Sequence, residues 1–182
     1  MEQRFAGQVV VVTGGAGGLG AAIVDRFLSE GARVALVDRD ATSVDAAAAA
    51  RDCLGLTADV SAQGEVAEAL DAVRDHLGPV DVLVSNAGVH GTYGFTEISD
   101  EEWAEQWAVH VMAHVYAARH VLPDMVERGS GHLVQTVSGV ALSTHQSAAY
   151  SATKRAALAL GETLRASYGP QGIGVTCFCP MG

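Results

Sequence analysis

Tyr150 and Lys154 are the residues whose types and spacing most directly suggest acid–base chemistry. They lie four residues apart in a segment with helical patterning, so their side chains share one face of a helix. An ammonium group beside a phenol favours the ionised phenol, and a phenol tuned in this way can act as a general acid or base. Lys154 is also the only lysine in a chain that otherwise uses arginine, which suggests that this position needs an ammonium group.

Ser138 lies twelve residues before Tyr150, just after an apolar segment, 132–137, that is typical of a buried strand. Ligands of α/β proteins bind at the carboxyl ends of strands, so the Ser138 hydroxyl is well placed to hold a carbonyl oxygen. The alternative is an ordinary solvated helix, on which Tyr-x-x-x-Lys pairs also occur. The catalytic interpretation is favoured because a second motif, near the N-terminus, indicates a dinucleotide.

That second motif is the glycine-rich turn after the first apolar segment. Gly15-x-Gly17-x-x-Gly20 matches the dinucleotide pattern, in which backbone N–H groups at the start of a helix bind a pyrophosphate. Asp38 lies eighteen residues after Gly20, where a carboxylate can accept a hydrogen bond from a ribose 2′-hydroxyl and repel a 2′-phosphate. A purely structural tight turn is the alternative, and the strand–turn–helix context with Asp38 favours the dinucleotide site.

Short apolar segments alternate with helical patterns along the whole chain, which predicts a parallel sheet with helices on both faces. Ser61 is the expected N-cap of the third helix, and Pro123 is expected to kink the fourth helix or to end it early. The sequence shows no linker, so residues 1–182 are predicted to form one doubly wound α/β domain. We expect strands at 8–13, 33–37, 53–57, 80–85, 132–137 and 173–178, and helices from the glycine turn to Gly31 and at 42–51, 61–77, 100–128 and 148–168.

The composition narrows the partners and the location. The 182 residues carry a formal net charge of −10, which argues against nucleic acid as a ligand. The apolar runs are shorter than the roughly 18 residues of a membrane span, and we expect neither a membrane span nor a signal peptide. The three cysteines, Cys53, Cys177 and Cys179, are too few for a disulfide framework, so we expect ordinary thiols in a cytoplasmic protein. Small molecules and further protein subunits remain as partners.

Together these motifs resemble those of the short-chain dehydrogenase/reductase family. The segment 13–20, Thr-Gly-Gly-Ala-Gly-Gly-Leu-Gly, matches the family's Thr-Gly-x-x-x-Gly-x-Gly turn. Asp59-Val60 resembles its adenine-contacting pair, and Asn86-Ala87-Gly88 resembles its fourth-strand motif. The resemblance covers nearly the whole chain, from about residue 8 to 180, and implies a Rossmann-like fold.

Ser138, Tyr150 and Lys154 fall on the family's catalytic positions, and the resemblance implies their roles. Tyr150 would give or take the proton of the substrate oxygen while a hydride moves to or from nicotinamide C4. Ser138 would orient that oxygen, and Lys154 would favour ionisation of the tyrosine and bind the nicotinamide ribose. The implied activity is that of an NAD(P)-dependent oxidoreductase acting on a small alcohol or carbonyl compound, in a homodimer or homotetramer.

The implied cofactor is NAD, with NADP less favoured. Asp38 resembles the acid of NAD-preferring members, and the glycine turn has no basic residue of the kind that NADP-preferring members place there. Arg39 follows Asp38 directly and keeps NADP open. The implied cofactor-binding residues are Gly14, Gly17, Gly18, Leu19, Gly20, Asp38, Arg39, Asp59, Val60, Asn86, Ala87, Gly88, Tyr150 and Lys154.

His110 stands where the family usually has an asparagine, seven residues after Trp103, that holds a water in a proton relay. Histidine can also hold a water and move protons near neutral pH, so His110 is a fourth catalytic candidate, although its bulk could crowd the nicotinamide end. His110 and His114 also have the i, i+4 spacing of a zinc-binding helix. The sequence lacks the glutamate of that motif and an evident third ligand, so no metal is expected.

The sequence ends shortly after the last expected strand, whereas family members continue through a substrate-covering loop, a further helix and a seventh strand. We therefore expect a sheet truncated after strand six, with the substrate-lid region absent from this chain and the substrate unspecified. This ending and the histidine at position 110 leave a second function open, a non-catalytic dinucleotide-binding module with a regulatory or scaffold role. The remaining candidates for the pocket wall are Tyr93, Phe95, Ser143, Thr144 and His145.

Overall fold

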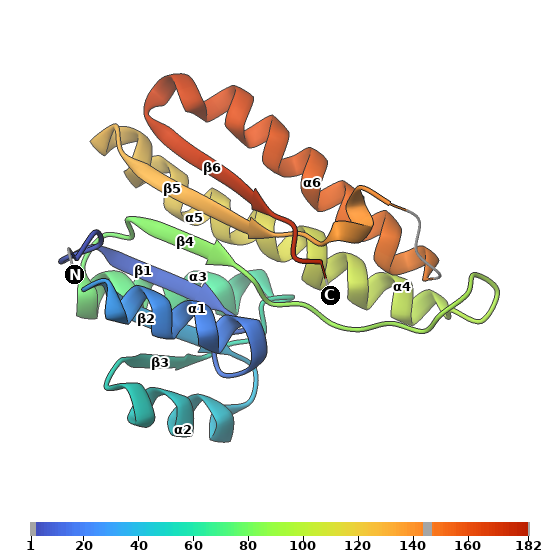
Figure 1. Ribbon diagram of the computed structural model, residues 1–182, viewed down its shortest axis with the longest axis horizontal. Helices are drawn as coiled ribbons and strands as arrows, with labels where there is room; N and C mark the ends of the chain where they lie inside the picture. The colour runs from blue at the N-terminus through green and yellow to red at the C-terminus, as the bar shows by residue number, and fades with distance from the viewer. Residues whose placement is uncertain (1–2, 144–146, 182) are drawn as a thin grey trace.

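The computed structural model describes residues 3–143 and 147–181, which form one parallel β-sheet with helices on both faces (Figure 1). The strand order is β3-β2-β1-β4-β5-β6, and every neighbouring pair is parallel. The order reverses between β1 and β4, which is the doubly wound, Rossmann-like arrangement predicted from the sequence. The strands are β1 (Val9–Thr13), β2 (Arg33–Asp38), β3 (Leu54–Thr57), β4 (Val82–Ser85), β5 (Gly131–Thr136) and β6 (Ile173–Phe178).

The helices fill the connections between consecutive strands. Two of them, α4 and α5, lie in one connection and are joined by a π-helical turn, Ala108–Met112. Short 3₁₀ turns, Gly139–Ala141 and Gly169–Gln171, flank α6. None of the described helices is long and apolar enough to cross a membrane. The α-helices are α1 (Gly18–Ser29), α2 (Ala41–Arg51), α3 (Gln63–Leu77), α4 (Asp100–Trp107), α5 (Ala113–Arg128) and α6 (Ala148–Tyr168).

The central strand β1 consists of four valines and a threonine, and all five are buried. β-Branched residues suit extended backbone, and a strand covered on both faces needs no polar alternation. Val9 and Val11 pack into a core shared with α3 and α5, and Val10 and Val12 pack into a core shared with α1 and α2. The two cores fix the register of the sheet, so the carboxyl ends of β1, β2 and β4 meet at one edge.

The predicted strands agree with the structure to within two residues at each end. The N-cap predicted for the third helix is wrong, and of the two outcomes predicted for Pro123 the structure excludes the early helix end. Helix α3 has Ala62 rather than Ser61 as its N-cap, because the Ser61 hydroxyl donates instead to Asp59 Oδ1 at 2.7 Å. Helix α5 continues through Pro123 to its end at Arg128. Pro123 is exposed, so water can reach the carbonyl that the missing N–H leaves without a helical partner.

The single helix expected at 100–128 is interrupted by the π-helical turn Ala108–Met112. A π turn takes one residue more than an α turn, so it rotates the following residues to a new face, and such turns are frequent at functional sites. His110 stands in the middle of this turn and is completely buried. The interruption therefore falls where the sequence departs from the pattern of the family that it resembles.

Candidate active site

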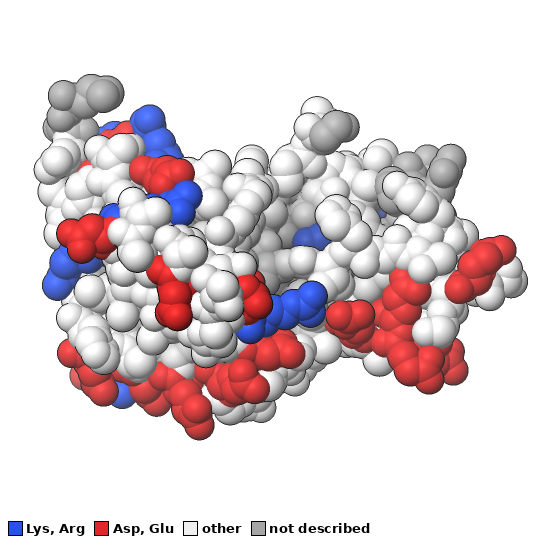
Figure 2. Space-filling view, turned by 90° about the horizontal axis from the view of Figure 1, so that it is seen from below, with Lys and Arg blue, Asp and Glu red and all other residues white. Residues whose placement is uncertain are grey.

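A cavity of about 450 Å³ opens at the carboxyl ends of the strands, where the strand order reverses. Figure 2 shows the molecule hollowed near its centre, with a basic side chain inside the hollow and acidic side chains gathered along the lower margin. Every residue expected to bind a cofactor lines this cavity. These residues are Gly14, Gly17, Gly18, Leu19, Gly20, Asp38, Arg39, Asp59, Val60, Asn86, Ala87, Gly88, Tyr150 and Lys154.

The glycine turn has the form that a pyrophosphate requires. Helix α1 begins at Gly18 with Gly17 as its N-cap, and no side chain in the described part of the chain caps this end. The first N–H groups and the positive end of the helix dipole are thus available to an anion. No described atom lies within 4 Å of the point where a Cβ on Gly17 would stand, so a phosphate can approach the backbone closely. The residues present therefore fit a dinucleotide.

Gly20 and Asn86 hold this turn against the neighbouring strand. A Cβ on Gly20 would overlap the Gly14 carbonyl oxygen and come within 2.7 Å of Asn86 Nδ2. Asn86 donates from its backbone N to Thr13 Oγ1 at 2.9 Å and from Nδ2 to the Thr13 carbonyl at 3.0 Å. The segment after β4 therefore lines the cavity and also fixes the end of β1.

Asp38 ends β2 at the other side of the turn. Its carboxylate accepts hydrogen bonds from the backbone N–H groups of Ala16 at 3.2 Å and Arg39 at 2.8 Å. These bonds orient the carboxylate and leave lone pairs that can accept from ribose hydroxyls. The Arg39 side chain lies 3.9 Å from Glu105 across the cavity mouth, and both groups are exposed, so this ion pair contributes little stability.

Asp59 lies after β3 on the same cavity wall. Its Oδ1 accepts from the Ser61 N–H and hydroxyl, and these bonds, with a smaller contribution from the Arg39 charge, hold the pKa of Asp59 below its usual value. The ionised carboxylate keeps the turn at 59–61 in one shape. Asp59 thus has a structural role beside its position on the cavity wall.

Tyr150 and Lys154 reach the cavity from α6. Lys154 is only 3% exposed, and its Nζ donates to the Thr136 carbonyl at 3.1 Å and lies 5.7 Å from the centroid of the Tyr150 ring. Burial lowers the pKa of Lys154 to about 8, so its ammonium group is mostly charged at neutral pH. This arrangement places a positive charge over the half-buried ring of Tyr150, inside the cavity.

Ser138 does not lie on the described wall of the cavity. It follows Val137, which does line the cavity, and its Oγ accepts a hydrogen bond from the Val140 N–H at 3.2 Å. Gly139 next to it donates to the carbonyl of Pro180, another cavity residue. Ser138 is therefore held beside the cavity with its own hydroxyl hydrogen still to donate.

His110 lies behind the cavity wall, next to the cavity residue Val109. Its Nε2 accepts from the Val89 N–H at 3.0 Å, and its Nδ1 lies 3.0 Å from Thr153 Oγ1. Burial, and then the Lys154 charge, lower the pKa of His110 to about 3. Both ring nitrogens are thus engaged, and the low pKa disfavours a charged imidazole near neutral pH.

His114 is also buried, and neither of its ring nitrogens has a hydrogen-bond partner among the described residues. Burial lowers its pKa to about 3, with smaller contributions from Lys154 and His110. Within residues 3–143 and 147–181, no group of three or more His, Cys, Asp or Glu side chains is arranged to hold a metal ion.

The sequence did not predict part of the cavity wall. It also did not predict Thr153 as the partner of His110, although Thr153 lies between Tyr150 and Lys154 in the sequence. The proposed outer-wall residues Tyr93, Phe95 and Ser143 are exposed and do not line the described cavity, while Thr144 and His145 lie outside the described residues. The wall residues not foreseen are Ala58, Val89, His90, Val109, Thr136, Val137 and Pro180.

The doubly wound sheet, the uncapped glycine turn and the carboxylate after β2 define a dinucleotide-binding α/β protein. Comparison with known proteins gives the family. The short chain dehydrogenase family model matches residues 8–182, and the chain belongs to that family.

Curated relatives agree with this assignment. The chain is 37% identical to a 1-deoxy-11-beta-hydroxypentalenate dehydrogenase from Streptomyces exfoliatus, with 95% of this chain and 66% of that protein covered. It is 33% identical to a D-threitol dehydrogenase from Mycolicibacterium smegmatis, with 97% and 70% covered. The chain therefore spans about two thirds of the length of these relatives.

A solved structure shows the same fold. L-Sorbose reductase from Gluconobacter frateurii, complexed with NADPH and L-sorbose, superposes with a TM-score of 0.92 at 32% identity, covering 99% of this chain and 71% of that chain.

Proposed function

We propose that the protein is an oxidoreductase that transfers a hydride between a nicotinamide cofactor and a small alcohol or carbonyl compound. One observation carries this proposal: Tyr150 and Lys154 share a single cavity with the glycine turn and Asp38. A site that only bound a dinucleotide would not need a phenol paired with a buried ammonium group. The relatives' names, dehydrogenases of alcohols, support the proposal and give no support to the non-catalytic alternative.

In this mechanism residues of the chain transfer a proton to or from the substrate oxygen. The Tyr150 hydroxyl donates to or accepts from that oxygen, and the Lys154 ammonium stabilises the phenolate that results. The Ser138 hydroxyl hydrogen, which its contact with Val140 leaves to donate, orients the same oxygen. The nicotinamide, when bound, supplies or accepts the hydride. Lys154 is held by Thr136, so its charge stays in place while the proton moves.

The proposed cofactor is NAD(H) rather than NADP(H). The oriented carboxylate of Asp38 can accept from ribose hydroxyls and would repel a 2′-phosphate. Arg39 on the same wall is the feature that favours a phosphate, and the sorbose reductase of the same fold is complexed with NADPH, so NADP(H) is the alternative cofactor. A homodimer or homotetramer and a cytoplasmic location are also proposed, by resemblance to the family.

The test is a calorimetric titration of the chain with NADH, with NADPH as the comparator. We expect NADH to bind more tightly than NADPH, and Asp38→Ala to reduce that preference by at least tenfold. Tyr150→Phe should bind NADH with unchanged affinity and lose turnover on a panel of alcohols and carbonyls, because only the transferable proton is removed. Failure of the wild-type chain to bind either cofactor would refute the proposal, as would full turnover by the Tyr150 variant.

A further inference from the structure

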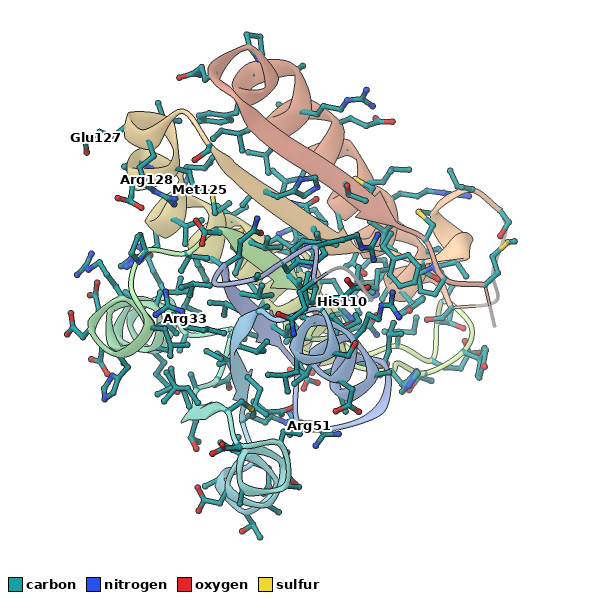
Figure 3. All side chains as sticks on the ribbon, turned by 60° about the vertical axis from the view of Figure 1, so that its left-hand side comes forward. Arg33, Arg51, His110, Met125, Glu127 and Arg128 are labelled. Carbon is teal, nitrogen blue, oxygen red and sulfur yellow. The ribbon has the colours of Figure 1, made fainter. Side chains whose placement is uncertain are left out.

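His110 contacts two segments that both contribute residues to the cavity wall, α6 and the segment after β4. Figure 3 shows it near the centre of the molecule. Its Nε2 faces the backbone N–H of Val89 at 3.0 Å, and a backbone N–H can only donate. Nε2 must therefore be the acceptor and carry no hydrogen. Val89 directly follows Asn86–Gly88, so this bond anchors the cofactor-lining segment after β4.

The other ring nitrogen fixes the tautomer. Thr153 Oγ1 lies 2.9 Å from the Ala149 carbonyl and 3.1 Å from the Tyr150 carbonyl, and its single hydrogen points to these acceptors. Toward His110 the hydroxyl can then only accept, so Nδ1 of His110, 3.0 Å away, carries the hydrogen. The network assigns one neutral tautomer, protonated on Nδ1.

The same imidazole contacts the catalytic pair. Thr153 lies one residue before Lys154 and three after Tyr150, and the His110 and Tyr150 rings meet edge to face with centroids 5.3 Å apart. A Cβ on Gly88 would stand 3.6 Å from His110 Nε2 and 3.8 Å from Lys154 Nζ. The cofactor-lining segment, the imidazole and the ammonium group thus converge on one point.

The charges around His110 favour the same neutral form. Burial makes the largest contribution to its low pKa, and Lys154 and His90 oppose a positive charge, while only the Val89 bond acts the other way. These groups come from α6 and from the loop after β4, and the next histidine on its own helical segment, His114, is itself buried. A protonated His110 would also have no acceptor on Val89.

We propose that His110 is a positioning residue: its Nδ1-protonated, neutral imidazole clamps α6 at Thr153 to the segment after β4 at Val89, and so sets where Tyr150 and Lys154 stand relative to the bound cofactor. It carries no proton during turnover. This inference rests on the proposed oxidoreductase function and deepens it.

The first test uses side chains that keep different parts of the clamp. His110→Phe keeps a ring against Tyr150 and removes both hydrogen bonds, His110→Asn can place a donor near the Nδ1 position, and His110→Gln can place an acceptor near the Nε2 position. We expect His110→Phe to lower kcat on the order of 10- to 100-fold, the scale of a misplaced catalytic group, with smaller losses for the two amides. The pH profile of kcat/KM should keep its shape in all three, since no relay group is removed. A profile that loses one limb in His110→Phe would overturn the inference.

The second test uses Thr153. Thr153→Ser keeps the hydroxyl and should retain wild-type kcat within about threefold, whereas Thr153→Val keeps the volume, removes only the bond to Nδ1 and should lose no more activity than His110→Phe. Because His110→Phe already removes the bond to Thr153, the double variant should be little worse than His110→Phe alone. Losses that simply multiply would show that the residues act separately and that the clamp is wrong.

The third test does not depend on activity. Imidazole ¹⁵N spectra of the chain should show His110 with a protonated Nδ1 and a bare Nε2 that stay unchanged from about pH 8 to about pH 5.5. An Nε2-protonated ring, or titration within that range, would refute the clamp. If the wild-type chain turned over no alcohol or carbonyl, the proposed function would fail. The clamp would then be judged on these spectra and on the same double-variant cycle measured by unfolding.

Discussion

The two buried histidines predict that the protein loses stability between about pH 6.5 and pH 5, above the range in which carboxylates protonate. His110 and His114 are almost inaccessible to solvent, and burial lowers the pKa of each to about 3. In the unfolded chain an imidazole has a pKa of about 6.5. Below that pH the two imidazoles bind protons in the unfolded chain but not in the folded protein. The free energy of unfolding therefore falls as the pH falls.

The size of the effect follows from these pKa values. At pH 5 each imidazole is about 1.5 pH units below its unfolded pKa and still neutral in the folded protein, which corresponds to about 2 kcal/mol for each histidine. The two histidines together therefore lower the free energy of unfolding by about 4 kcal/mol between pH 7 and pH 5. This is a large part of the 5–15 kcal/mol that is typical of a domain. The loss continues until the pH nears the folded pKa of about 3.

Carboxylates change the free energy of unfolding in a lower pH range. The ion pair and hydrogen bond with Arg4 lower the pKa of Glu30 to about 2, from 4.5 in the unfolded chain, so its contribution is complete above about pH 4.5 and is lost as the pH falls toward 2. A change in the free energy of unfolding between pH 6.5 and pH 5 therefore comes from histidines. His132, whose pKa burial also lowers, adds to the loss in the same direction.

The assay is urea unfolding at constant ionic strength at pH 7, 6 and 5, with the wild type, His114→Leu and His76→Gln compared. His114→Leu removes one of the two imidazoles and should reduce the pH dependence by roughly half. His76 is exposed on α3, so His76→Gln is the matched control and should leave the dependence unchanged. A wild-type free energy of unfolding that is flat between pH 7 and pH 5 would refute this reasoning.

Three glycine substitutions, one of them a control, test the packing at the site and between α6 and β6. Gly20→Ala should weaken NADH binding more than tenfold and destabilise the chain by about 1–3 kcal/mol, because its Cβ would overlap the Gly14 carbonyl oxygen, as titration and urea unfolding would show. Gly64→Ala on α3 meets no described atom within 4 Å and should leave NADH binding unchanged, which makes it the control. Gly161→Ala on α6 should cost a similar 1–3 kcal/mol in unfolding without a specific loss of NADH affinity, since its Cβ would overlap Cys177 Sγ. Unchanged stability in Gly161→Ala would show that α6 and β6 pack less closely than the structure indicates.

The sheet and the dinucleotide turn were predictable because both depend on local sequence. Valine runs such as Val9–Val12 and a glycine cluster between strand and helix need no distant information to be recognised. The ribose-binding role of Asp38 was predicted from its distance along the chain to Gly20. Residues of the glycine turn and Asp38 line one cavity of the structure.

The features that the sequence did not predict depend mostly on contacts between distant segments of the chain. The π turn at Ala108–Met112 leaves no clear mark in the periodicity, because one extra residue shifts the helical pattern without breaking it. The chemistry of His110 could not be judged from its residue type, since its tautomer is decided by Val89 and Thr153, which lie 21 and 43 residues away. Pro123 does not end α5, and its exposure, which the sequence alone does not give, lets water reach the carbonyl that the missing N–H leaves without a helical partner.

The bonds between Asn86 and Thr13 span 73 residues, and the same cavity also takes its wall from α6 near the other end of the chain. No contiguous fragment of the chain can carry this binding site, so a ligand of the cavity has affinity only for the fully folded protein. Mass action then makes such a ligand a folding effector: at a concentration one hundred times its Kd it adds about 3 kcal/mol to the free energy of unfolding. A bound ligand of this cavity would thus also lower the population of unfolded chain that is open to proteolysis.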